Sequence, residues 1–151
     1  MRIVVAAVGR WKRDPARELF DAYRQRCRWR IDLHEVVARK DGDAAAVQAD
    51  EAAQLCRAIP AGAHTIALDA RGRNLSSQAF ADWLADAREA GGRDVAVLIG
   101  GADGLTDAVR QRADLTLALG AMTWPHVLVR VMLAEQLYRA QCIQDGHPYH
   151  R

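Results

Sequence analysis

The sequence predicts an α/β fold, with a mostly parallel sheet and helices on both faces of that sheet. The apolar runs Arg2 to Val8 and Val95 to Ile99 show no polar alternation, which is typical of strands covered on both sides. Segments with helical spacing of apolar residues lie between such runs, so strand and helix alternate along the chain. Glycine-bearing turns follow two of the runs, and open α/β sheets bind ligands at the carboxyl ends of their strands.

The 151 residues are expected to form one domain, because this length buries a single core. The net charge of +2 permits an RNA partner without arguing for one. Cys27, Cys56 and Cys142 form no CxxC pair, so we expect small buried residues in a reducing cytosol and no metal site. No apolar segment reaches the roughly 20 residues of a membrane span, and no signal-peptide pattern opens the chain. A cytoplasmic protein with no membrane partner is therefore expected.

The N-terminal half is predicted to contain three strands and two helices. Asp14-Pro15 is typical of an N-cap followed by proline in the first helical turn, and Leu19, Tyr23 and Cys27 define the expected buried face of that helix. In order, the elements are a central strand at Arg2 to Val8, this helix, a strand from Ile31 to Val37, an alanine-rich helix from Ala44 to Ile59 capped by Asp43, and a strand at Thr65 to Asp69 with a polar exit loop at Ala70 to Asn74.

The C-terminal half is predicted to continue the alternation. In order, the elements are a helix capped by Ser76 or Ser77 with Phe80, Trp83, Leu84 and Ala87 inward, the Val95 strand, a short helix near Thr106 to Arg112, a strand at Leu115 to Leu119, and a final helix at His126 to Ile143. Apolar residues spread around the whole final helix instead of forming one stripe. We therefore expect one of its faces on the sheet and another against a second subunit.

Three strand ends are candidate ligand loops: Leu68-Asp69 onward, Gly100 to Gly104, and Gly120 to Pro125. Glycine lets a ligand approach the backbone, although the same glycines could serve only tight turns. The pattern is not GxGxxG and has no Walker lysine, which disfavours dinucleotides and nucleoside triphosphates. Arg130, inside the apolar final helix, needs a ligand or a structural salt bridge if it is buried.

The end of the chain, residues 145–151, carries His147, Tyr149, His150 and an arginine. A disordered tail is one interpretation of this segment. The other is a site completed against a neighbouring subunit, because so many titratable groups follow a helix that we expect at an interface.

Four motifs occur in order along the chain: Leu-Ile-Gly-Gly-x-x-Gly-Leu at 98–105, Met-Thr-x-Pro-His-x-Leu-x-Arg at 122–130, Glu-Gln-x-Tyr-Arg-Ala at 135–140, and His-Pro-Tyr-His at 147–150. Together they resemble a bacterial family, the RlmH ribosomal large subunit pseudouridine methyltransferases of the SPOUT class. The resemblance covers the whole chain. It implies a homodimer with a C-terminal deep trefoil knot (an α/β knot), in which the last helix is threaded through a preceding loop. It also implies S-adenosylmethionine as cofactor and N3-methylpseudouridine in helix 69 of 23S rRNA, within the assembled ribosome, as product.

The resemblance assigns cofactor contacts to eight residues: Leu68, Gly101, Gly120, Ala121, Met122, Thr123, Trp124 and Pro125. Trp124 is bulkier than the leucine or phenylalanine expected there, and Ala102-Asp103 stands where a pair such as proline-glutamate is common.

Methylation of an imide nitrogen needs a base, or a cation that stabilises the developing anion. The candidates are His126, Arg130, His147, Tyr149 and His150, with the tail residues acting in the partner's site. Arg130 is expected to orient the target base or stabilise its anion, and His150 and Tyr149 to contact the nucleotide.

Four arginines at 24, 26, 28 and 30, together with Trp29, form a basic and aromatic run that could bind rRNA phosphates; an ordinary solvated face is the alternative. Two rival functions remain at this point. A non-catalytic ribosome- or RNA-binding α/β module would share this patch but would not need three glycine-bearing loops. A nucleotide-dependent enzyme on a Rossmann-like sheet lacks its usual fingerprint here.

Overall fold

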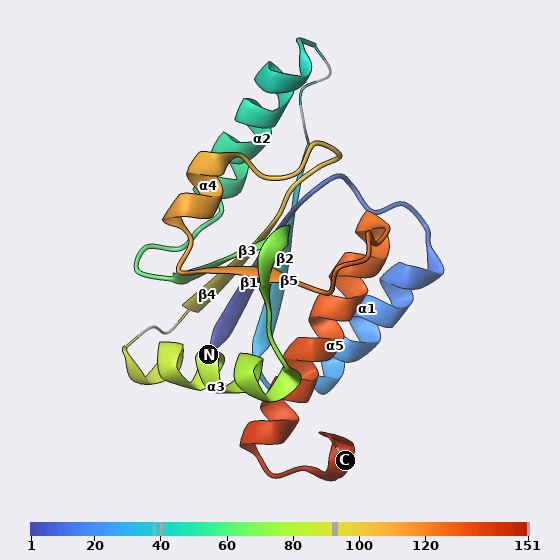
Figure 1. The fold of residues 1–151 in the computed structure, drawn as a ribbon. Helices are drawn as coiled ribbons and strands as arrows, with labels where there is room; N and C mark the ends of the chain where they lie inside the picture. Colours follow the sequence, from blue (N-terminus) through green and yellow to red (C-terminus); the bar gives the residue numbers. More distant parts are fainter. Residues whose placement is uncertain (38, 40, 92–93, 151) are drawn as a thin grey trace.

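The protein is described by a computed structural model, which covers all residues except 38, 40, 92–93 and 151. Its five strands form one all-parallel sheet in the order β2-β1-β4-β3-β5. Helices α1, α3 and α5 cover one face of this sheet, and α2 and α4 cover the other (Figure 1). The predicted α/β class is confirmed. The elements are β1 (Arg2–Val8), α1 (Pro15–Arg26), β2 (Arg30–Val36), α2 (Ala44–Arg57), β3 (His64–Asn74), α3 (Ser77–Glu89), β4 (Asp94–Ile99), α4 (Asp107–Arg112), β5 (Leu115–Ala118), α5 (His126–Gln144) and the 3-10 turn η1 (Pro148–His150).

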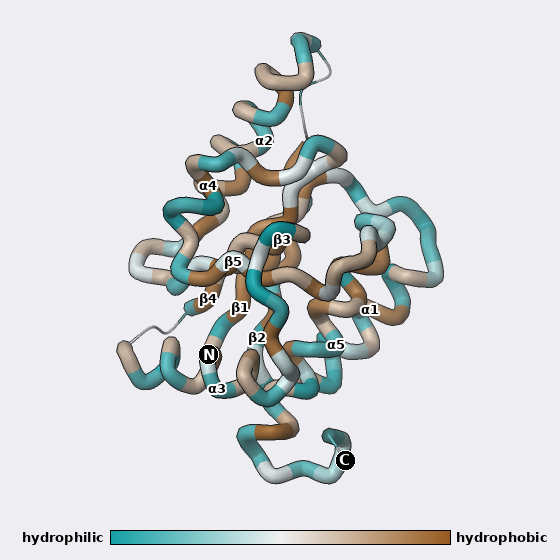
Figure 2. The backbone as a smooth tube through the Cα atoms, viewed as in Figure 1, coloured by the Kyte–Doolittle hydropathy of each residue, from teal (hydrophilic) through white to brown (hydrophobic). Residues whose placement is uncertain are grey.

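Strand β1 lies inside the sheet and contributes to the core on both sides. Ile3 and Val5 pack in the large cluster under α1, α3 and α5, whereas Ala6 and Val8 pack in the smaller cluster under α2 and α4. Side chains alternate between the two faces of a strand, so a run that is apolar at every position fits a strand covered twice. Figure 2 shows the apolar strands at the centre of the fold.

The helix starts follow the capping residues that the sequence shows. The side chain of Asp14 accepts a hydrogen bond from the Ala16 N–H at 2.7 Å, with proline at the start of α1. Ser76 caps α3 by accepting from the Ala79 N–H at 3.1 Å. Such caps satisfy N–H groups that have no partner within the helix, which fixes where the helix begins.

Leu19 does not lie on the buried face of α1, contrary to the prediction. Its side chain is 49% exposed, and the neighbouring Phe20 is the helix residue that enters the core. Leu19 and Phe20 are both apolar, and the spacing of apolar residues alone selected Leu19 for the buried face instead of its neighbour Phe20. Leu19 instead lines a surface groove described below.

Strand β3 continues through Ala70 to Asn74, a segment predicted as an exit loop. Leu117 of β5 pairs with Leu68 and again with Arg73. One edge of a strand residue pairs with only one partner, so the two stretches of β3 must pair with opposite edges of β5. The chain therefore crosses over β5 between Leu68 and Arg73. It does so at Gly72, where an added Cβ would lie 2.7 Å from the Leu117 backbone. In Figure 1 the green chain crosses in front of the orange β5.

All three cysteines are free. Burial raises the pKa of Cys27 to about 11, so its thiol stays protonated near neutral pH. Within the described part of the chain, no helix is long and apolar enough to cross a membrane. The same residues include no group of histidine, cysteine, aspartate or glutamate side chains placed to hold a metal ion.

Candidate functional site

The carboxyl ends of β4, β3 and β5 lie side by side at one edge of the sheet, because these strands are parallel neighbours. The loop after β5 is tied to the loop after β4 by His126, whose Nε2 lies 2.8 Å from the carbonyl oxygen of Gly100. The loop after β3 is tied to β5 by the second pairing at Arg73 and Asn74. The predicted convergence of three strand ends is therefore present.

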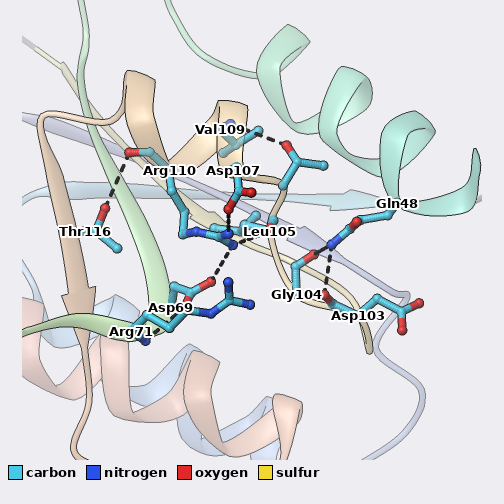
Figure 3. A network of polar contacts seen from close by, with 11 residues as sticks. Gln48, Asp69, Arg71, Asp103, Gly104, Leu105, Asp107, Val109, Arg110 and Thr116 are labelled. Atoms are coloured by element: carbon cyan, nitrogen blue, oxygen red, sulfur yellow. Dashed lines mark hydrogen bonds and ion pairs between the residues drawn. The ribbon is translucent and has the colours of Figure 1, made fainter. Parts of the chain in front are cut away.

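Arg110 connects the segment that follows Leu68 in β3 to the loop after β4 (Figure 3). Its guanidinium forms a 3.0 Å ion pair with Asp69 at the exit of β3, and it donates to the carbonyl of Leu105 after β4 and to the Asp107 carboxylate. The Asp69 and Arg110 side chains are both largely buried. A charged pair of this kind, with hydrogen bonds on several sides, holds two loops in a fixed relation.

The glycine loop after β4 is tightly folded. The Gly104 N–H donates to the Gly101 carbonyl at 3.0 Å, and a Cβ on Gly100 would lie 2.6 Å from the Gly104 backbone. Gln48 of α2 also donates to the Asp103 and Gly104 carbonyls, at 2.9 and 3.3 Å (Figure 3). These contacts leave no room for a side chain at Gly100.

The predicted cofactor residues fall into two environments. Leu68 is buried within β3, just before the segment that crosses β5, and Gly101 lies in the folded glycine loop. The six residues Gly120 to Pro125 are all exposed. Within them, Met122 is 73% and Trp124 is 40% exposed, while Trp124 Nε1 donates to the Leu119 carbonyl at 3.1 Å. An exposed apolar loop beside accessible backbone suits a ligand with a flat ring and a polar chain.

Arg130 is 2% exposed and is held by the protein itself. Its Nη2 donates to the carbonyl oxygens of Val8 and Gly9 at 2.7 and 2.8 Å, and its Nη1 donates to Glu35 at 3.3 Å. The guanidinium also lies 5.0 Å from the ring centre of Trp11. Burial lowers the pKa of Arg130, and Glu35 partly offsets this effect. These contacts attach α5 to the exit of β1.

His126 is uncharged near neutral pH, because burial and then the nearby charge of Arg130 lower its pKa. A carbonyl can only accept, so the proton of the neutral ring lies on Nε2, facing Gly100. Only Nδ1 is then free to accept a proton.

The tail folds back onto its own subunit. The Tyr149 hydroxyl donates to Glu135 at 3.1 Å and lies 3.5 Å from the Tyr23 hydroxyl. Burial, and then these hydrogen bonds, raise the pKa of Tyr149 well above its ordinary value, so it remains a neutral phenol. His147 and His150 are exposed.

The tail and the loop Gly120–Pro125 lie at opposite ends of α5 (Figure 1). With 19 residues, this helix is about 28 Å long. The structure therefore does not bring the tail candidates together with the three loops inside one chain.

Three arginines of the basic run near the end of α1 pair with carboxylates, two of which are shared with Arg2 and Arg17. Arg24 pairs with Asp21, Arg28 with Asp145, and Arg30 with Asp32. Arg26 stacks on aromatic rings, at 4.4 Å from the centre of Tyr138 and 5.3 Å from that of Tyr149. Trp29 is buried in the core and cannot stack on a nucleotide base. The prediction is therefore wrong for Trp29, whereas phosphate binding by the arginines stays a prediction beside the alternative of an ordinary solvated face.

An apolar groove of about 460 Å³ adjoins the loop after β5. It runs from Gly120 along α5, where Met132 and Gln136 line it, to Leu19 and Tyr23 of α1. Exposed apolar side chains that line a groove between two helices are typical of a subunit interface.

Glu51 of α2 is a residue that the sequence interpretation missed. It is 7% exposed and lies directly against Gly101. A single glutamate in an alanine-rich helix carries no sequence signal of its own. Only the position of α2 over the glycine loop shows its importance.

Comparisons with known proteins agree with this geometry. A family model described as "Predicted SPOUT methyltransferase" matches residues 1–150. The chain belongs to the SPOUT methyltransferase family. It is 55% identical to the ribosomal RNA large subunit methyltransferase H of Rhodospirillum centenum, and 50% identical to the protein of that name from Paramagnetospirillum magneticum. Each match covers all of this chain and 99% of the relative.

A solved structure of a probable methylase family protein from Haemophilus influenzae Rd KW20 shares the fold, with a TM-score of 0.59 and 15% sequence identity. That match covers 99% of this chain and 70% of the other. In the SPOUT methyltransferases the C-terminal part of the fold is knotted. In this chain, residues 69–74 cross over β5, and we refer to this segment as the covering loop.

Proposed function

We propose that this SPOUT methyltransferase transfers a methyl group from S-adenosylmethionine to N3 of a pseudouridine in helix 69 of 23S rRNA. The observation that carries the proposal is the full-length 55% identity to a ribosomal RNA large subunit methyltransferase H. The convergence of three strand ends supports it, because a methyl donor needs one crevice that can hold it beside the target. The site of action would be the assembled ribosome in the cytoplasm.

The donor would lie between Leu68, Gly101 and the loop Gly120–Pro125. These residues fit it, because exposed Met122 and Trp124 offer apolar contact for a purine, while the neighbouring backbone offers polar groups. When bound, the donor supplies an electrophilic methyl group on a sulfonium. The chain itself supplies the position of the donor.

A homodimer would complete the site. A partner seated on the groove along α1 and α5 would cover Leu19 and Met132, and could bring its tail to the crevice that this chain's own tail cannot reach. Oligomers of two subunits are usually twofold symmetric, so both sites would be completed in the same way.

The contacts also narrow the roles of the five candidate catalytic residues. His126 uses its N–H on Gly100, Tyr149 is a neutral phenol, and both Nη groups of Arg130 bind the protein. His147 and His150 are exposed and would face the nucleotide in the partner's site. The imidazole of an exposed histidine can act as the base that removes the imide proton.

The decisive experiment incubates the protein with labelled S-adenosylmethionine and ribosomes that lack the modification, and then maps the label. The expected result is one labelled methyl group at N3 of a pseudouridine in helix 69. If the protein binds ribosomes but neither binds nor uses the donor, it is a non-catalytic ribosome-binding module. Label elsewhere on the rRNA would contradict the proposed target.

Mixing two inactive variants tests the shared site. One variant lacks residues 148–151, and the other carries Gly120→Val, which is strained because Gly120 has a φ of +107°. A mixed dimer has one intact site, so an equal mixture should regain about a quarter of wild-type activity. If no activity returns although mixed dimers form, the tail does not act in the partner's site.

A further inference from the structure

Two side chains from opposite faces of the sheet meet the same peptide of the glycine loop. His126 of α5 binds the Gly100 carbonyl at 2.8 Å. Glu51 of α2 lies on the other side, where a Cβ on Gly101 would be 2.7 and 2.8 Å from its two carboxylate oxygens. The Gly100–Gly101 peptide is therefore held between the two helices.

The carboxylate of Glu51 is an unusual group to bury here. Burial raises its pKa, as do the negative charges of Asp103 and Asp50, and the only opposing influence is the Gly101 N–H. Among the groups that act on it in the described part of the chain, none is a cation. A buried carboxylate without a cation is costly, so its retention beside a ligand loop points to a functional role.

We propose that Glu51 is a positioning residue for the methyl donor, which acts with His126 to hold the Gly100–Gly101 peptide between α2 and α5. This inference rests on the proposed function for its ligand but not for its geometry. It also gives a second reason for a glycine at position 101. A Cβ at position 101 would have to displace the Glu51 carboxylate from the peptide that it supports, in addition to obstructing any approach by the ligand.

The first test compares Glu51→Ala, Glu51→Gln and the control Asp50→Ala. Asp50 is adjacent on α2, but its carboxylate accepts from Gln54 instead of meeting the glycine loop. S-adenosylhomocysteine affinity is measured by calorimetry, and kcat and KM for the methyl donor are measured on ribosomes. Losing one support of the loop is worth about 1 kcal/mol, so Glu51→Ala should weaken binding and raise KM about fivefold, with kcat at saturating donor unchanged.

Glu51→Gln keeps the size and one acceptor oxygen and should bind within about threefold of wild type. Asp50→Ala should bind like wild type. Three results would overturn the proposal. One is wild-type affinity in Glu51→Ala, and another is a lower kcat with unchanged affinity. The third is a loss in Glu51→Gln that affects the cationic donor but not S-adenosylhomocysteine, which would mean direct charge contact.

A double-mutant cycle tests the explanation for Gly101. Gly101→Ala alone should weaken S-adenosylhomocysteine binding, because the new Cβ displaces Glu51. In the Glu51→Ala background the same substitution should cost little further, since the obstructing carboxylate is gone. If both backgrounds show the full loss, the ligand and not Glu51 requires the glycine, and the proposal fails.

Amide hydrogen exchange at Gly104 provides a readout without any ligand. This N–H donates to the Gly101 carbonyl, so its protection reports the order of the loop. Exchange should be about fivefold faster in Glu51→Ala than in wild type and unchanged in Asp50→Ala. Equal exchange in all three proteins would overturn the inference. Wild-type protein that fails to bind S-adenosylhomocysteine would instead overturn the proposed function.

Discussion

Replacing Arg130 by methionine should destabilise the fold more than it impairs chemistry. The guanidinium makes two short hydrogen bonds to the carbonyls of Val8 and Gly9, and each bond from a charged donor is worth about 1.5–3 kcal/mol. Their sum, about 3–6 kcal/mol, is an upper limit, because methionine removes the cost of burying the charge. Glu35 is left 26% exposed to water and still accepts from the Trp11 N–H. We therefore expect a loss of about 3 kcal/mol, at the lower end for a broken buried pair.

Urea unfolding measures this loss, at one fixed protein concentration because the stability of the proposed dimer would depend on it. Arg139→Met is the matched control. Arg139 lies on the same helix and pairs with Glu135, but its side chain is 25% exposed. Its loss should cost less than about 1 kcal/mol.

One outcome would refute the structural role of Arg130. If Arg130→Met lost less than about 1 kcal/mol of unfolding free energy and yet abolished methyl transfer, the guanidinium would act on the substrate.

Three further predictions concern other buried contacts. The pKa of His126 is lowered in the fold, so the folded state binds a proton less readily than the unfolded state. The urea midpoint should therefore fall as the pH drops below about 6.5, and His126→Gln should make the midpoint depend less on pH. The pKa of Glu51 is raised, so its charge costs stability near neutral pH. Glu51→Gln should therefore have a higher Tm than wild type at pH 7, and this difference in Tm should disappear in acid, where the wild-type carboxyl is protonated. Gly72→Ala forces a Cβ against the Leu117 backbone and should cost about 1–3 kcal/mol or more in the same urea assay.

Much of the fold followed from local chemistry. Apolar runs identified the strands, and Asp14, Asp43 and Ser76 marked helix starts, because capping groups and strand burial leave direct traces in the sequence. The meeting of three strand ends also followed, since parallel strands end at one edge.

Other features depend on contacts between distant segments. Nothing in Ala70 to Asn74 indicates that this polar stretch crosses β5, because the pairing partner lies more than forty residues away. Leu19 is apolar whether it faces a core or a groove. The partners of Arg130 are backbone carbonyls, which any residue carries. The knot itself was expected from the family resemblance and not from the pattern of residues.

The crossing of β3 over β5 places a condition on how the protein is made. Residues 69–74 leave the ribosome before the segment that must finally lie beneath them, so the native topology is reached only after the last helix has entered the covering loop. Bringing such distant parts together is slow. A rigid fusion partner after residue 151 would have to follow that helix, whereas one before residue 1 would not, so purification tags and reporters belong at the amino end.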